Sequence, residues 1–118
     1  MPREVVWMGD SRKRLKEFPK ETQRSMGGAL LLAQFGGTAD HAKPFKGVGS
    51  GVFEIVESHL KNAYRVVYAV QIGEKIYVLH AFQKKSKTGI KTPKPDVELV
   101  KQRYQEAQEF AKDDETGY

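Results

Sequence analysis

Residues 64–72, YRVVYAVQI, and residues 75–83, KIYVLHAFQ, decide the fold of this chain. Both segments are rich in β-branched and aromatic residues, which favour strands, and the linker between them has the length of a hairpin turn. A third segment of the same kind, residues 52–58, comes shortly before them. The three segments predict an antiparallel meander.

The segments near the N-terminus predict a strand and two helices. Residues 4–8 have the composition of a short strand that ends in a turn. Asp10 or Ser11 can cap the helix that follows, until Pro19 interrupts it. Apolar residues at helical spacing then indicate a second helix over about residues 20–35.

Two features between this helix and the meander depart from regular patterns. Gly27 and Gly28 lie inside the second helix, and each costs about 1 kcal/mol relative to alanine. Close packing against a neighbour is the expected compensation, and a break in the helix is the alternative. Residues 38–51 are aperiodic and predict a loop.

The C-terminal part predicts a loop and a last helix. Residues 84–95 contain five lysines and no acid, so they predict a solvated loop. Asp96 is expected to cap a helix whose apolar stripe must be covered by the sheet, by a second chain or by a partner. The whole pattern predicts an α+β fold: N-terminal strand, helical hairpin, three-stranded antiparallel meander and C-terminal helix. The stripe of the last helix consists of Val97, Val100, Tyr104, Ala107 and Ala111.

Length and charge limit the class of protein. The chain has 118 residues, enough for one domain, which we expect over residues 1–112. Three of its 15 acids lie in residues 113–118, which we expect to form a disordered tail, and the net charge is +5. The basic body favours a polyanion such as nucleic acid as partner. Without cysteine, a signal segment or an apolar run of about 18 residues, a cytoplasmic protein without membrane contact is expected.

The familiar catalytic and cofactor motifs are missing from the sequence. No phosphate-binding GxxxxGK[ST] loop occurs, and residues 47–51, GVGSG, precede a strand instead of a helix, which indicates a flexible loop. His41, His59 and His80 have neither metal-ligand spacing nor a paired carboxylate beside them. We therefore expect no metal and no cofactor.

Cationic residues form the candidate site. Arg65 is expected on the open face of its strand, opposite the side chains that pack against the helices. His80 on the next strand and Lys84 and Lys85 at the end of that strand should lie close to it. Fixed cations of this kind stabilise the charge that develops in phosphoryl transfer, so the cluster suits RNA cleavage by the neighbouring 2′-hydroxyl.

Each of these residues also has a structural explanation. Arg65 can pair with Glu54 or Glu57 across the strands. His80 alternates in step with the apolar positions Ile76, Val78 and Phe82, which suits a buried core histidine. The two lysines can be an ordinary solvated strand end, and the basic run from residue 12 to residue 16 can be a solvated helix face.

The strand sequences resemble phage-derived, HigB-like toxins of the RelE/ParE superfamily. The resemblance covers roughly residues 4–110 and implies the same order of strands and helices. It further implies a toxin that cuts mRNA, usually on the ribosome, until a helix-turn-helix antitoxin masks it. The segments that carry it are Glu54-Ile55, residues 63–68 (AYRVVY), residues 77–86 (YVLHAFQKKS) and Thr92-Pro93.

The resemblance also implies roles for particular residues. Arg65 matches the strand arginine of the superfamily, and Lys84 or Lys85 matches its second basic catalytic position within one residue. Some members carry lysines on the preceding strand, where this chain has Glu54 and Glu57. His80, Glu54 or a loop residue such as Lys46 would therefore have to act as general base.

The sequence-based hypothesis is a metal-independent, ribosome-dependent mRNA endoribonuclease toxin. Its catalytic residues would be Arg65, Lys84, Lys85 and His80. A non-enzymatic toxin that binds a protein such as DNA gyrase, or an RNA- or ribosome-binding module without cleavage activity, are the alternatives. The residues expected to hold the RNA backbone are Lys43, Lys46, Lys87 and Lys91.

Overall fold

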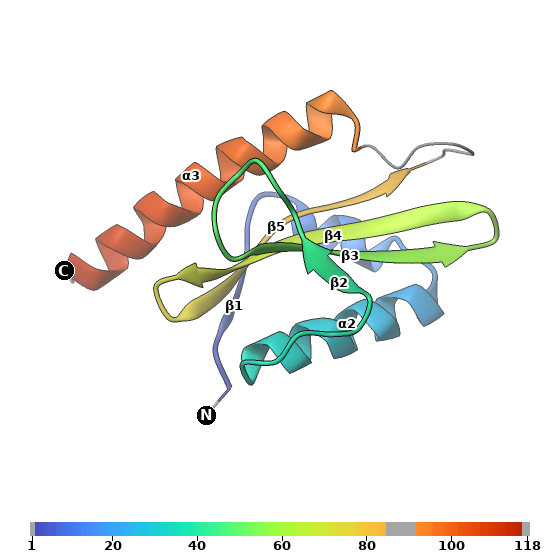
Figure 1. Ribbon diagram of the computed structural model, residues 1–118, viewed down its shortest axis with the longest axis horizontal. Coiled ribbons are helices and arrows are strands. Elements are labelled where there is room, and N and C mark those ends of the chain that lie inside the picture. Colours follow the sequence, from blue (N-terminus) through green and yellow to red (C-terminus); the bar gives the residue numbers. More distant parts are fainter. Residues whose placement is uncertain (1, 85–91, 117–118) are drawn as a thin grey trace.

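The computed structural model describes residues 2–84 and 92–116, with the side chains of residue 84 and residues 114–116 left out. A five-stranded sheet in the order β1-β5-β4-β3-β2 separates two helical layers (Figure 1). The predicted α+β architecture is confirmed. The elements are β1 (Val5–Trp7), α1 (Ser11–Lys16), α2 (Lys20–Gln34), β2 (Ala42–Pro44), β3 (Val52–His59), β4 (Asn62–Ile72), β5 (Lys75–Lys84) and α3 (Lys94–Thr116).

The predicted meander forms the centre of the sheet. Strands β3, β4 and β5 pair antiparallel, and β1 pairs parallel to β5 along one edge. The β3–β4 connection is a tight turn in which Leu60 and Lys61 both have positive φ, 49° and 70°. Two successive residues in this conformation match the right-handed twist of paired strands. The expected loop over residues 38–51 is wrong in one part, because residues 42–44 pair with β3 as β2.

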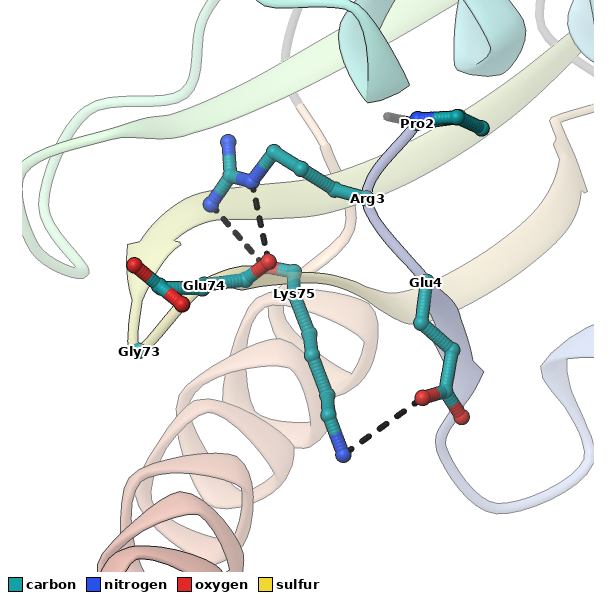
Figure 2. Close-up of a pocket in the computed structure, with 6 residues that line it drawn as sticks. All are labelled: Pro2, Arg3, Glu4, Gly73, Glu74 and Lys75. Atoms are coloured by element: carbon teal, nitrogen blue, oxygen red, sulfur yellow. Dashed lines mark hydrogen bonds and ion pairs between the residues drawn. The ribbon is translucent and has the colours of Figure 1, made fainter.

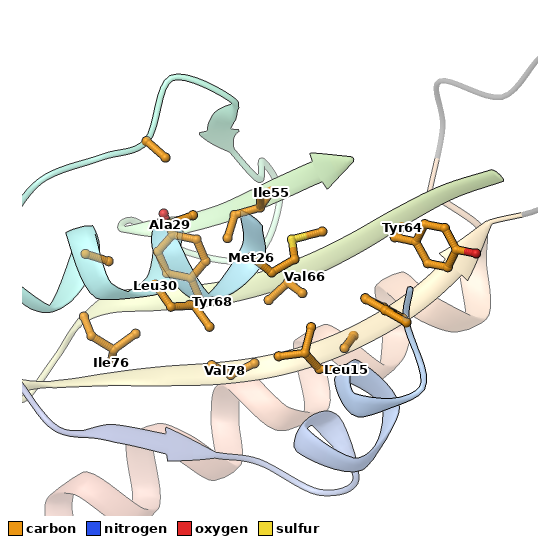
Figure 3. Close-up of a cluster of buried hydrophobic side chains, with 14 residues drawn as sticks. Leu15, Met26, Ala29, Leu30, Ile55, Tyr64, Val66, Tyr68, Ile76 and Val78 are labelled. Atoms are coloured by element: carbon orange, nitrogen blue, oxygen red, sulfur yellow. The ribbon is translucent and has the colours of Figure 1, made fainter. Parts of the chain in front are cut away.

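Both faces of the sheet are covered. Helices α1 and α2 pack on one face over the first hydrophobic core, which Figure 3 shows. Helix α3 packs on the other face, where its apolar stripe meets a second core, so the sheet is what covers the stripe. The expectation of an open face beside Arg65 is therefore wrong. The second core includes Val52, Val67, Leu79, Phe82, Val100 and Ala107.

A β-bulge in β5 changes which side chains share a face. Val67 pairs with His80 and the next residue, Tyr68, pairs with Val78, so Leu79 is an extra residue in the ladder. Before the bulge, Val78 packs under the helical hairpin, whereas Leu79 packs in the core beneath α3. The predicted alternation of His80 with Ile76 and Val78 is therefore wrong.

The helices also depart from the predictions at specific residues. Among the described residues, no heavy atom lies within 4 Å of a Cβ built on Gly27 or Gly28, so the expected close packing there is wrong. Helix α3 begins at Lys94, which places Asp96 in its first turn and not at the cap. The same helix continues to Thr116, beyond the boundary expected at residue 112. No helix in the described part of the chain has the length and apolar character needed to cross a membrane.

Candidate functional site

A line of polar side chains crosses the sheet on the face that α3 covers. It begins at Lys43 on β2, whose Nζ lies 3.6 Å from Oε1 of Glu54 on β3. Oε2 of Glu54 in turn lies 3.1 Å from Nη1 of Arg65 on β4. The pairing of Arg65 with Glu54, one of the two carboxylates considered from the sequence, is confirmed. We call these residues, together with His80 and Asp96, the cross-sheet row.

Arg65 is buried where the sequence predicted an exposed position. Only 4% of the residue is accessible, and Glu54 is 7% accessible. In the β4–β5 ladder, Arg65 is paired with Phe82. A buried charge is tolerated when it is paired, and the hydrogen bond between Arg65 and Glu54 provides that pair.

His80 and Asp96 continue the row from β5 to the first turn of α3. Nε2 of His80 lies 2.7 Å from Oδ1 of Asp96. The imidazole also stacks on the Phe82 ring, with centroids 4.7 Å apart and planes inclined by 19°. The bulge at Leu79 makes this possible, because it turns His80 towards α3. The imidazole is thus held from two sides in one orientation.

The proton positions on His80 follow from its partners. A carboxylate only accepts hydrogen bonds, so Nε2 carries the proton that it donates to Asp96, and Nδ1 keeps its lone pair. Burial lowers the pKa of His80, and Asp96 opposes that shift only in part. The ring is therefore neutral at pH 7, with Nδ1 able to accept a proton.

Two buried polar atoms of the row are left without hydrogen-bond partners in the described structure. They are Nε of Arg65 and Nδ1 of His80. Arg65 pairs with Phe82 and His80 pairs with Val67, so the two residues are diagonal neighbours on adjacent strands. Buried polar atoms are rarely left unpaired, so this donor and this acceptor on neighbouring strands are candidate contacts for a polar ligand.

Arg103 of α3 fixes the bulge behind His80. Its Nη1 donates to the carbonyl oxygen of Leu79 over 3.0 Å, and its Nη2 donates to Oδ1 of Asp10 over 2.8 Å. The hydrogen bond from Arg103 lowers the pKa of Asp10. Arg103 therefore joins α3, the bulge and the start of α1. Sequence reasoning missed it, because an arginine within an amphipathic helix gives no sign of facing inward.

The predicted lysines lie in three different situations. Lys43 joins the row through Glu54 and is exposed, as is Lys46 in the following loop. Lys84 is the last residue of β5, paired with Ala63, and its side chain is not described. Lys85, Lys87 and Lys91 lie outside the described residues. The convergence of Arg65 with Lys84 and Lys85 therefore stays a prediction.

A second polar cluster joins α2 to β3 on the opposite face. Ser25 donates a hydrogen bond to Oε1 of Glu57, and His41 Nε2 lies 3.5 Å from the same oxygen. The serine and the carboxylate thus meet the same nitrogen of His41, so they do not form a nucleophilic triad, in which a carboxylate and a serine bind opposite nitrogens. These residues come from three separate segments of the chain, so no sequence motif predicts the cluster. Among the described residues, no three metal-binding side chains converge.

A cavity of about 520 Å³ lies at the far end of the sheet, between the N-terminus and the β4–β5 turn (Figure 2). Arg3 lines this cavity, and its guanidinium donates to the carbonyl oxygens of Val70 over 2.6 Å and Glu74 over 3.1 Å. These bonds tie the N-terminal segment to the hairpin. We assign a structural role to this cavity.

The similarity of this chain to known proteins consists mainly of one family match. Residues 13–105 match the family described as phage-derived protein Gp49-like (DUF891). No curated protein matches the sequence. Among solved structures, the toxin–antitoxin complex RelBE2 from Mycobacterium tuberculosis matches with 16% identity and a TM-score of 0.48. That match covers 71% of this chain and 100% of the other.

Proposed function

The chain belongs to the phage-derived Gp49-like family, a family of RelE/HigB-type toxins, and we propose that it acts on RNA. The proposed activity is metal-independent endonucleolytic cleavage of mRNA, carried out on the ribosome. The proposed partner that restrains it is a helix-turn-helix antitoxin. The observation that carries the activity is the Asp96–His80 pair, which is diagonal to Arg65 on the adjacent strand. Arg65 and His80 are both buried in the described structure, so the proposed cleavage requires RNA binding to open this face.

His80 has the features of a general base. A carboxylate holds one ring nitrogen, which fixes the tautomer, and the other nitrogen has no partner among the described residues. The lowered pKa keeps the ring neutral near pH 7, as a base requires. Apart from its role in orienting the ring, Asp96 stabilises the imidazolium that forms when Nδ1 takes up a proton.

The proposed cleavage uses the RNA's own hydroxyl as nucleophile. Nδ1 of His80 removes the proton of the 2′-hydroxyl, and the 2′-oxygen forms a bond to the adjacent phosphorus. The bond from phosphorus to the 5′-oxygen breaks, and solvent supplies the proton to that oxygen. The products are a 2′,3′-cyclic phosphate and a 5′-hydroxyl. Nε–H of Arg65 would donate to a phosphate oxygen and stabilise the charge that develops there.

Exposed cations beside the row would hold the rest of the RNA. Lys43 lies at the solvent end of the row, with 56% of its side chain exposed, and Lys46 follows in the loop after β2. Each phosphate contact of this kind releases counterions, so binding would weaken as salt rises. Lys84, Lys85, Lys87 and Lys91 remain proposed members of the same surface.

The decisive experiment measures cleavage of ribosome-bound mRNA by purified protein. His80→Gln is expected to lower the cleavage rate by about 10²–10⁴-fold, the usual contribution of a general base. His59→Gln is the matched control, because His59 lies 3.9 Å from Glu21 on the other face of the sheet. Cleavage should persist in excess EDTA. Wild-type cleavage by a folded His80→Gln protein would overturn the assignment.

The covered sheet face supports a second candidate function. Helix α3 and an apolar core occupy the face of Arg65, and this suits a toxin that binds a protein target such as DNA gyrase without cutting RNA. Inhibition of gyrase supercoiling with mRNA left intact would favour this candidate. Salt-dependent RNA binding without cleavage would instead indicate a binding module.

A further inference from the structure

The outward face of α2 exposes three large apolar side chains at its C-terminal end. Leu31 is 53% exposed, Leu32 is 44% exposed and Phe35 is 64% exposed. Single exposed leucines are ordinary, whereas a contiguous apolar patch marks an interaction site. Figure 1 shows that α2 forms the outer layer of the molecule on its side of the sheet.

The spacing of these residues defines a stripe along the helix. Arg24, Gly28, Leu31 and Phe35 follow one another at intervals of four, three and four residues and therefore lie on one face. All four are exposed. The opposite face carries the buried side chains of the first core, which include Met26 at 0% exposure. We call the exposed stripe, together with Gly27 and Leu32, the α2 face.

The two glycines leave the middle of the α2 face without projecting side chains. Among the described residues, no heavy atom comes within 4 Å of a Cβ built on Gly27 or Gly28. The fold itself therefore has no need of glycine at either position, although glycine weakens a helix. A second helix lying across this point could approach closely, because side-chain size sets the distance between helix axes.

The charges around the α2 face are mainly positive. Arg24 is part of the stripe and Lys20 precedes it by one turn. A groove of about 280 Å³ runs along the flank at Gly27, and Arg12 and Lys16 are among the residues that line it. Glu21 lies at the edge that faces His59, 3.9 Å from its ring. Such a surface attracts an acidic partner.

We propose that the α2 face binds an acidic amphipathic helix of a partner protein. The apolar side chains of that helix contact Leu31, Leu32 and Phe35, its backbone crosses α2 at Gly27 and Gly28, and its carboxylates face the cations. A nucleic acid would pair with the cations but would leave Leu31, Leu32 and Phe35 without apolar contacts. A second copy of this chain would bring the same cations against one another.

Selection from a displayed library of random 20-residue helices tests the proposal on the full-length protein. Enriched sequences are expected to combine leucines at intervals of three and four with flanking acids. Phe35→Ser and Gly28→Gln are each expected to weaken their binding at least tenfold. Gly28→Gln separates docking from stability, because it should raise Tm while it blocks close approach.

Phe110→Ser is the matched control, because Phe110 is 52% exposed on α3, away from the α2 face. Its binding to the selected helices should equal that of wild type. Enrichment of basic helices, or equal binding by wild type and Phe35→Ser, would overturn the proposal. Sedimentation of wild type as a dimer that Phe35→Ser dissolves would also overturn it, in favour of self-association.

Discussion

Oδ1 of Asp96 lies 2.7 Å from Nε2 of His80, across the junction between α3 and β5. The contact joins a helix to the strand at the point where a bulge turns the histidine towards that helix. It decides which ring nitrogen carries the proton and leaves Nδ1 as the basic atom. The chemistry that we propose for this toxin depends on this contact.

The first prediction concerns the pH dependence of RNA cleavage. His80 must be neutral to act as a base, so cleavage should rise with pH as the ring loses its proton. Burial lowers the pKa of His80, so the midpoint should lie below the ordinary value of 6.5. Asp96→Asn should shift the midpoint further down and reduce the plateau rate. Single-turnover cleavage rates measured between pH 4.5 and 8.5 would reveal both effects, because pKa shifts in proteins are commonly about 1 unit.

A midpoint at or above 6.5 would contradict the assignment of His80 as the base. The His59→Gln protein is again the control, and its profile should coincide with that of wild type. An Asp96→Asn profile identical to the wild-type profile would show that the carboxylate has no influence on the ring.

The second prediction concerns folding stability and pH. The pKa of His80 is lower in the folded protein than in the unfolded chain, so the unfolded chain binds its proton first as the pH falls. The free energy of unfolding should be unaffected by His80 above about pH 6.5 and should decrease as the pH falls through and below that value. His80→Gln should remove this part of the pH dependence. Urea denaturation at successive pH values measures the difference, and parallel curves for the two proteins would contradict the prediction.

The third prediction concerns the ion pair between Glu54 and Arg65. Their side chains are only 9% and 5% exposed, so Arg65→Met should leave a buried carboxylate short of its partner and cost about 3–5 kcal/mol of unfolding free energy. Lys43→Met removes the exposed partner of the same carboxylate and should cost no more than about 1 kcal/mol. Chemical denaturation gives both values. Equal effects of the two substitutions would show that burial does not make the Glu54–Arg65 pair stronger than the exposed Glu54–Lys43 pair.

The sequence predicted the layers of the fold well, because alternation in strands and spacing in helices report directly on burial. It did not reveal β2, since three residues with a proline and a lysine carry little strand signal. It also placed Arg65 on the correct face of β4 but treated that face as open. The apolar stripe of α3 was recognised, yet the sequence left open whether the sheet or a partner covered it.

The candidate site was predictable only in part. Glu54 and Glu57 are three residues apart on β3, so they lie on opposite faces of the strand. Only the structure shows that Glu54 meets Arg65 while Glu57 meets Ser25. The bulge leaves no mark in the sequence, so the expected alternation of His80 with Ile76 and Val78 is wrong, although His80 does lie on the face of Arg65. Asp96 was read as a cap because acids favour helix starts, which concealed its contact with His80.

The last prediction concerns Gly9, which lies between β1 and α1 with φ of 54°. A Cβ on Gly9 would lie 2.5 Å from Nη2 of Arg103, the atom that binds Asp10, so Gly9→Ala must displace the guanidinium that also holds the carbonyl of Leu79. Gly36 has a φ of 88°, and no described atom lies within 4 Å of a Cβ built there. Gly36→Ala should therefore lower the unfolding free energy only by the cost of the backbone conformation, about 1–2 kcal/mol. Gly9→Ala should cost about 3–5 kcal/mol, because charged hydrogen bonds are lost as well.

A double variant that combines Gly9→Ala with Arg103→Met tests this explanation. The two losses should be less than additive, because both substitutions remove the same contacts. Full additivity in urea denaturation would show that Gly9 is needed for its backbone conformation alone and that Arg103 can adjust to the added methyl group.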